Sequence, residues 1–201
     1  MRKALLHLRK SDPVLAEIIE RVGAYKCRHE APDFQSIARA IVYQQLHGKA
    51  AATIFGRLVA LAGDPLTPQG VLKLSVEQMR GAGLSKQKLS YLRDLAERTQ
   101  RGELDFTLLP ELSDDEVIAR LTQVKGIGVW TAHMFLMFAL KRPNVLPVGD
   151  LGIQTAIRKH YKKRKLLKPQ QMEKIAKCWE PYRSVACWYL WRSLDVKTPE
   201  A

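Results

Sequence analysis

Cysteine and long hydrophobic runs are both scarce in this sequence. The three cysteines, Cys27, Cys178 and Cys187, form no CxxC pair, so neither a disulfide framework nor a zinc or iron–sulfur site is indicated. The longest clean apolar run, residues 134–140, is far shorter than a membrane span. Charges are spread through the first ten residues, which is not typical of a targeting segment. We therefore expect an intracellular protein without a membrane anchor or a cofactor.

Strand-like alternation of polar and apolar residues is also missing. Apolar residues recur instead at helical spacing, as at Leu89, Leu92 and Leu95, which predicts an all-α fold. The predicted helices cover residues 12–22, 34–62, 75–81, 86–101, 114–123, 129–140, 151–162, 170–178 and 182–194. Helix-starting residues support these boundaries at Asp33, Ser75, Ser113 with Glu116, and Pro181.

Acidic residues are few relative to basic ones. The chain has 33 Lys and Arg against 20 Asp and Glu, which leaves a net charge of +13. Such a balance favours a polyanionic partner, with nucleic acid the leading candidate, although a basic surface can also serve solubility alone. The run 162–165, Lys-Lys-Arg-Lys, fits a phosphate backbone, but taken alone a solvated helix end explains it better.

The most informative stretch is residues 121–133, LTQVKGIGVWTAH, in which one predicted helix ends and another begins at once. Two glycines, Gly126 and Gly128, allow a tight turn and a close approach of the backbone to a ligand. The start of the new helix then presents amide groups and a positive dipole end, which attract an anion. A glycine pair between helices is more often a plain connection, but Lys125 and the following Thr131 and Ala132 make the pattern more specific.

The string VKGIGVWTA resembles the hairpin of the helix-hairpin-helix DNA glycosylases, usually LPGVG or FPGIG followed by two variable residues and TA. It departs from that pattern at Lys125, where proline is common. The resemblance implies that the hairpin amides hold a DNA phosphate, often through a bound monovalent cation. The hairpin residues expected at DNA are Lys125, Gly126, Ile127, Gly128 and Thr131.

The resemblance also implies two helical lobes with a DNA cleft between them. One lobe would be a central bundle of residues 34–140 that ends in the hairpin, residues 121–133. The other would combine residues 1–33 with residues 141–201 and would carry the catalytic aspartate.

Asp150 is the candidate catalytic residue. Pro147 and Gly149 form a bend before it, and it stands at the head of a predicted helix, so on its own an N-cap is the better explanation. The family changes that balance, because its catalytic aspartate follows the hairpin and a proline-containing loop in the same way. A fixed carboxylate would stabilise the positive charge that builds on the sugar as an N-glycosidic bond breaks, or would orient or deprotonate water.

Trp130 stands where the family members that also cut the DNA strand carry a Schiff-base lysine, two residues after the last hairpin glycine. With no lysine in register, we expect hydrolysis of the base alone and an intact abasic strand. The four-cysteine cluster of some relatives is absent too.

A glycosylase must rotate its target nucleotide out of the duplex and fill the gap. The segment 41–51, IVYQQLHGKAA, resembles the family's wedge region. We expect Gln45 or Leu46 to enter the stack and Gln44 and His47 to lie at the minor groove. The structural alternative is a buried Leu46 beside a solvated glutamine stripe.

By the same resemblance, Trp130, Met134 and Tyr182 would line the base pocket. The ending 179–191, WEPYRSVACWYLW, resembles the W-x-P-x-R-S-x-A-x-x-x-x-W ending of the branch that removes alkylated purines. Those bases are positively charged, and an aromatic face attracts a cation by up to about 2 kcal/mol. Core packing is the alternative for each aromatic, and the better one for Trp188 and Trp191.

The segment 81–91 matches the branch in outline. Gly83 would end one helix and Ser85 would cap the next, while Lys86 and Lys88 would contact backbone phosphates.

These patterns predict a monofunctional glycosylase that removes alkylated purines of the 3-methyladenine and 7-methylguanine type from double-stranded DNA. It would act as a monomer, associated with DNA, with no catalytic metal. The alternatives are a catalytically silent helix-hairpin-helix DNA-binding protein, a glycosylase for another lesion class, and a strand-cutting enzyme with its lysine elsewhere.

Overall fold

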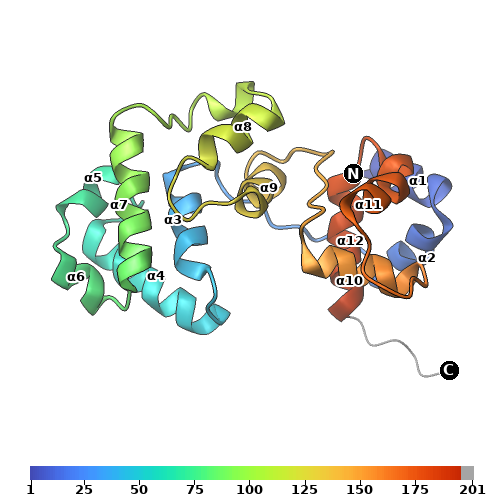
Figure 1. The fold of residues 1–201 in the computed structure, drawn as a ribbon, viewed down its shortest axis with the longest axis horizontal. Coiled ribbons are helices and arrows are strands. Elements are labelled where there is room, and N and C mark those ends of the chain that lie inside the picture. Colours follow the sequence, from blue (N-terminus) through green and yellow to red (C-terminus); the bar gives the residue numbers. More distant parts are fainter. Residues whose placement is uncertain (196–201) are drawn as a thin grey trace. The chain divides into compact units, whose positions relative to one another are not determined.

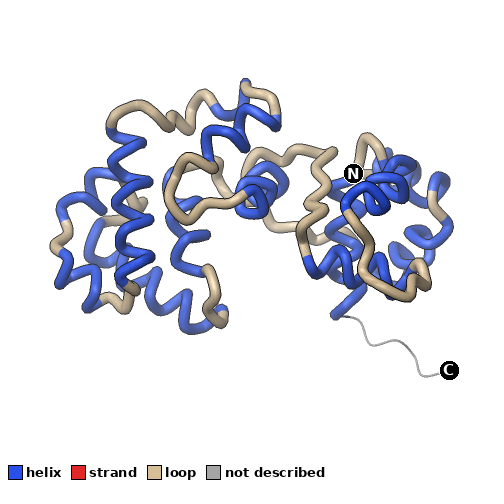
Figure 2. Tube along the Cα trace, viewed as in Figure 1, coloured by secondary structure: helices blue, strands red, loops and turns tan. Residues whose placement is uncertain are grey.

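The computed structural model describes residues 1–195, and every regular element among them is helical (Figures 1 and 2). Twelve α-helices and two short 3-10 turns are joined by loops, with no strand in the described range. The predicted all-α fold is therefore confirmed. The chain divides into two compact units, residues 30–140 and residues 1–29 together with 141–201. The DNA cleft expected between the lobes stays a prediction.

The unit of residues 30–140 is built around the long helix α7, Lys86–Gln100. Leu92, Leu95 and Ala96 are fully buried on α7, and the helix packs against α3, α5 and α6. The other helices of this unit are α3 (Phe34–Tyr43), α4 (Gly48–Ala62), α5 (Pro68–Lys73), α6 (Val76–Gly81), α8 (Asp114–Leu121) and α9 (Val129–Phe138), with a 3-10 turn at Leu109–Glu111.

The other unit is centred on α12, Arg183–Asp195, whose residues 184–190 are all buried. A helix buried on nearly every side needs covering on several faces, and α2 and α10 both pack against it. The remaining helices are α1 (Arg2–Ser11), α2 (Pro13–Val22), α10 (Leu151–His160) and α11 (Pro169–Ala176), with a 3-10 turn at Lys177–Trp179.

The predicted helix-starting residues act as caps. The Asp33 side chain accepts from the Ser36 amide at 2.9 Å, and Ser75 and Ser113 each form a reciprocal capping box. Ser85 caps α7 through the Lys88 amide at 3.1 Å. Pro181 follows a cis peptide bond, and α12 begins two residues later, at Arg183.

Three helix predictions were wrong. The helix expected over 34–62 is two helices, because the chain leaves helical geometry at Gln44 and Gln45 takes a positive φ of 57°. Two short helices, α1 and α5, were not predicted. Helix α5 does have a start signal, Thr67 followed by Pro68. The Thr67 hydroxyl accepts a hydrogen bond from the Gly70 amide. No helix of residues 1–195 has the length and apolar character needed to cross a bilayer.

Candidate functional site

The hairpin between α8 and α9 is tied to α7 through Asp94. The Lys125 amide donates to Asp94 Oδ2 at 2.9 Å, and Lys125 Nζ lies 3.7 Å from Oδ1. Burial opposes ionisation of Asp94, but hydrogen bonds from Lys125 and Arg98 outweigh it, and the pKa of this carboxyl lies below its usual range. Proline has no amide hydrogen, so Lys125 supplies a bond that the more common residue would lack. The Lys125 ammonium therefore faces Asp94.

Gly126 is required by the tight packing of this turn. Its φ is +80°, and a Cβ there would lie 2.1 Å from the ring of Tyr91 on α7. Ile127 is buried beneath the turn, whereas Gly128 and the first residues of α9 are exposed. The turn thus presents backbone amides at the surface, as an anion-binding hairpin requires. Thr131, the residue after the exposed Trp130, is buried.

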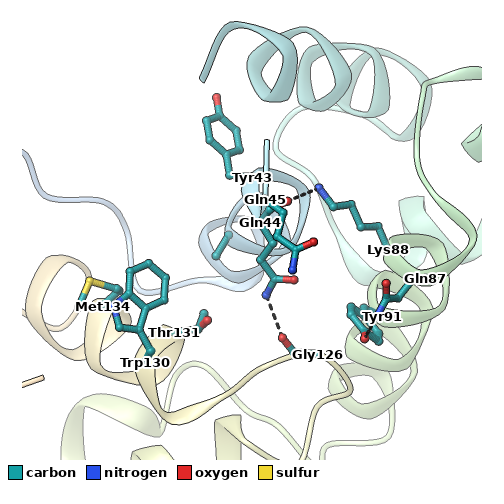
Figure 3. Close-up of a pocket in the computed structure, with 11 residues that line it drawn as sticks. Tyr43, Gln44, Gln45, Gln87, Lys88, Tyr91, Gly126, Trp130, Thr131 and Met134 are labelled. Carbon is teal, nitrogen blue, oxygen red and sulfur yellow. Dashed lines mark hydrogen bonds between the residues drawn. The ribbon is translucent and has the colours of Figure 1, made fainter. Parts of the chain in front are cut away.

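A pocket of about 550 Å³ opens beside the hairpin (Figure 3). Trp130 and Met134 lie on one side of it, Tyr43 and Gln44 on another, and Tyr91 on α7 faces the turn. Its lining is more apolar than polar, which suits a flat heteroaromatic ring. The lining residues are Ala40, Tyr43, Gln44, Gln45, Gln87, Lys88, Tyr91, Gly126, Trp130, Thr131 and Met134.

The structure thus brings two of the three predicted pocket residues together. Tyr182 does not line this pocket. It belongs to the unit of residues 1–29 and 141–201, where its ring lies 5.5 Å from that of His7. Its role at the base stays a prediction.

The predicted wedge residues form the break between α3 and α4. Gln44 is half-buried, and its Nε2 donates to the Gly126 carbonyl at 2.8 Å. Gln45, Leu46 and His47 are exposed, with Leu46 39% accessible, so the alternative of a buried Leu46 is wrong. Lys88, expected at a phosphate, instead donates to the carbonyls of Val42 and Gln44 at 2.5 and 2.8 Å.

Asp150 is a buried N-cap in the other unit. It is 7% exposed, and its Oδ1 accepts from the Ile153 amide and from the indole Nε1 of Trp191, each at 2.8 Å. Core packing is therefore the wrong explanation for Trp191, although Trp188 is buried as expected. Gly152 makes this contact possible, because a Cβ there would lie 2.9 Å from the Trp191 ring and 3.0 Å from Asp150 Oδ1.

The loop that carries Asp150 is held by the start of α12. Arg183 Nε donates to the carbonyl and side-chain oxygens of Asn144, and Ser184 Oγ donates to the Arg142 carbonyl at 2.6 Å and accepts from the Val145 amide at 3.0 Å. The R-S pair of the closing motif therefore fixes the loop, and its final tryptophan fixes the carboxylate. The motif is visible in the sequence, but neither of these two functions can be read from it.

The buried thiol of Cys187 lies near the Asp150 carboxylate. Burial first, and then the nearby carboxylate, raise the pKa of Cys187 above its usual range, so this thiol stays neutral. Among residues 1–195, no group of three or more His, Cys, Asp or Glu side chains is arranged to hold a metal ion.

Residues 38–181 match the model of the HhH-GPD superfamily of base excision DNA repair proteins. The chain belongs to this superfamily, which confirms the resemblance found in the sequence.

Individual relatives agree with this assignment. DNA-3-methyladenine glycosylase 1 of Schizosaccharomyces pombe is 35% identical over 199 residues, which cover 96% of this chain and 87% of the relative. A solved structure of the 3-methyladenine DNA glycosylase of that yeast in complex with abasic DNA matches with a TM-score of 0.85 at 34% identity, covering 96% and 97% of the two chains. The structure of a DNA-3-methyladenine glycosidase from Bacillus halodurans matches with a TM-score of 0.83 at 39% identity, covering 93% and 86%.

Proposed function

We propose that this protein is a monofunctional DNA glycosylase that removes alkylated purines from DNA by hydrolysing the N-glycosidic bond, which leaves an abasic site for base excision repair. The observation that carries the proposal is Asp150, a buried carboxylate held at a helix N-terminus by an amide and an indole N–H. Relatives named 3-methyladenine DNA glycosylases, similar over nearly the whole chain, support the substrate class.

The hairpin binds the DNA backbone. The exposed residues Gly126, Gly128 and Val129 offer backbone amides to a phosphate. The net charge of +13 strengthens binding to any duplex. Gln45, Leu46 and His47 enter the DNA where the damaged nucleotide leaves the stack. A monovalent cation at the turn stays a prediction. Two carbonyls of the turn, those of Val124 and Gly126, already accept hydrogen bonds from Ile127 and Gln44.

Asp150 stabilises the transition state. As the glycosidic bond lengthens, positive charge develops on the sugar, and a preorganised anion lowers the free energy of that state without having to reorganise. Two donors on one carboxylate oxygen fix its orientation before substrate arrives. The same carboxylate orients or deprotonates the attacking water.

The side chains present favour hydrolysis of cationic bases. Trp130 cannot form a Schiff base, so the reaction ends at the abasic site. Tyr43, Tyr91 and Trp130 give the pocket aromatic faces, which attract a positively charged alkylpurine more than its neutral parent. Such a base is already a good leaving group and needs little help from a general acid.

The protein acts as a monomer on double-stranded DNA, where it is found in the cell. The catalytic lobe is the unit of residues 1–29 and 141–201, and the binding lobe is the unit of residues 30–140.

The test is release of methylated purines from methylated duplex DNA in single turnover with saturating enzyme. We expect release by the wild type and a loss of about a hundredfold or more in Asp150→Asn. Asparagine keeps the N-cap, so the fold and the DNA affinity should persist. The matched control is Asp33→Asn, the same change at the N-cap of α3, which should leave the rate unchanged.

No release by the wild type would contradict the alkylpurine assignment and leave a glycosylase for another lesion or a silent DNA-binding protein. Equal release by the wild type and Asp150→Asn would keep the enzyme but exclude Asp150. Strand cleavage without added alkali would indicate a lysine nucleophile elsewhere.

A further inference from the structure

The loop between α3 and α4 is fixed at its first residue from two sides, as Figure 3 shows. The Lys88 ammonium reaches from α7 to the Gln44 carbonyl, and the Gln44 side chain reaches the hairpin carbonyl of Gly126. The following residues, 45–50, are all exposed. A single glutamine therefore joins the projecting loop to both the hairpin and the central helix of the unit.

This attachment lies next to a backbone conformation that is costly for glutamine. Gln45 has a φ of 57°, a region that non-glycine residues enter only at a cost. The peptide just before it is the one whose carbonyl accepts from Lys88 at 2.8 Å. The second bond of Lys88, to the Val42 carbonyl, satisfies one of the carbonyls left without a partner at the end of α3.

We propose that Lys88 is a positioning residue that holds loop 44–47 in the conformation that enters DNA, and so aligns the wedge with the hairpin that binds the phosphate. The proposal rests on the proposed function, because the loop must act on DNA. Lys88 is half-buried, and desolvation lowers its pKa, as expected for an ammonium turned toward carbonyls and away from water.

Two substitutions on α7 separate this role from a phosphate contact. Lys88→Met keeps most of the side-chain length and removes its donors. Lys86→Met is the contrasting variant, at an exposed lysine two residues earlier that is expected to contact a backbone phosphate. Loop insertion is followed by the fluorescence of 2-aminopurine placed beside an abasic-site analogue in a duplex. This readout needs no catalysis.

We expect Lys88→Met to weaken insertion about tenfold, since two charge-assisted hydrogen bonds are lost. The slope of log affinity against log salt should stay unchanged. Lys86→Met should instead lower this slope by about 0.9, because Lys86 is expected at a backbone phosphate. Release of base should slow in Lys88→Met on paired DNA and recover when the lesion lies in a bulge, where little stacking has to be disrupted.

Two results would overturn the proposal. One is a salt slope lowered by about 0.9 in Lys88→Met, which is the signature of one lost phosphate contact. The other is unchanged fluorescence in a folded Lys88→Met protein. If the wild type releases no alkylated base but Lys88→Met still loses insertion, the positioning role stands and the proposed activity fails.

A second variant covers the case in which Lys88→Met does not fold. Gln44→Leu removes the bond to the Gly126 carbonyl and leaves both acceptors of Lys88 in place. We expect a smaller loss of insertion. In the double variant the two losses should not add, because both contacts fix the same residue, Gln44. Normal insertion in Gln44→Leu and strict additivity would each contradict the shared attachment.

Discussion

Two buried aspartates cap helices in the same unit of this protein, and we expect them to have different roles. Asp12 caps α2 and is 5% exposed; Asp150 caps α10 and is 7% exposed. Each accepts from an indole, Trp179 Nε1 at 2.7 Å in one case and Trp191 Nε1 at 2.8 Å in the other. The chemistry of the two caps is thus nearly identical.

Their surroundings differ. Both oxygens of Asp12 are bonded: Oδ1 to the amides of Val14 and Leu15, and Oδ2 to the Tyr161 hydroxyl at 2.6 Å and to Trp179, which is fully buried. Burial first, and then Asp12, raise the pKa of Tyr161 above its usual range. The indole that donates to Asp150 belongs to Trp191, which is only half-buried. The Asp12 cap therefore lies against a core tryptophan, whereas the Asp150 cap lies against one that reaches the surface.

The comparison predicts that the same substitution should have opposite effects at the two sites. Asp150→Asn should lower the single-turnover rate by about a hundredfold or more and leave unfolding nearly unchanged, because the cap persists while the anion is lost. Asp12→Asn should leave the rate within about threefold wherever the protein is folded. Rates and urea denaturation on both variants check this. Similar rate losses in both would remove the distinction.

Asp12→Asn should lower the free energy of unfolding by about 3 kcal/mol, since an amide NH₂ placed opposite the Tyr161 hydroxyl and the Trp179 indole breaks a buried hydrogen-bond network. Chemical denaturation measures this loss. Tyr161→Phe, which removes one donor to the carboxylate, should cost less. A fully stable Asp12→Asn protein would show that the four bonds add little to stability.

The hairpin and Asp150 can be located from the sequence, because glycine spacing and a helix-starting carboxylate are local signals that the family resemblance made specific. The partners of the hairpin and of Asp150 cannot be found in this way. Trp191 was assigned to the core, since nothing in a run of apolar residues says which indole N–H faces a carboxylate 41 positions earlier. The attachment of Gln44 to Gly126 is equally non-local.

The break between α3 and α4 was missed for a different reason. Apolar residues continue at helical spacing across it, and Gln45 is neither glycine nor asparagine, the residues that usually mark a left-handed position. Tertiary bonds from Lys88 hold this geometry. Asp12 was overlooked because its partners come from residues 161 and 179, far along the chain.

Gly152→Ala should slow base release by about tenfold to a hundredfold. A methyl group 2.9 Å from the Trp191 ring and 3.0 Å from Asp150 Oδ1 must displace one of them, and a small misplacement of a catalytic group is costly. Alanine favours a helix more than glycine does, so stability should not fall in proportion. Gly56→Ala, in α4 with open space around it, is the control. An unaffected rate in Gly152→Ala would mean that the Trp191 contact can be lost without consequence.

Trp191→Phe and Trp179→Phe test the indole donors directly. Loss of the N–H at Trp191 should slow release by about tenfold at unchanged DNA affinity, and should cost nothing further in an Asp150→Asn background. Loss of the N–H at Trp179 should lower the free energy of unfolding by about 1 to 2 kcal/mol and spare the rate. Full additivity with Asp150→Asn would show that Trp191 acts on something other than the carboxylate.

The smallest effect concerns His160, at the end of α10 opposite Asp150 and next to Tyr161. Burial first, and then the charges of Arg21 and Lys159, lower its pKa to about 4. The Ser193 hydroxyl donates its proton to the Leu190 carbonyl at 2.6 Å, so it accepts a hydrogen bond from His160 Nε2 at 2.8 Å. The other ring nitrogen of His160, Nδ1, lies 3.5 Å from the Arg21 guanidinium. A neutral ring satisfies both contacts, whereas a second ring proton would point at a guanidinium.

Because the folded pKa lies below the unfolded one, the unfolded chain binds the proton first as the pH falls, and stability is lost between about pH 6.5 and 4. The unfolding free energy should fall by about 1 kcal/mol between pH 7.5 and 5, allowing for solvent screening. His160→Gln should flatten this slope without moving the rate at neutral pH. If the slope survives the substitution, a group other than His160 governs the acid sensitivity of the protein.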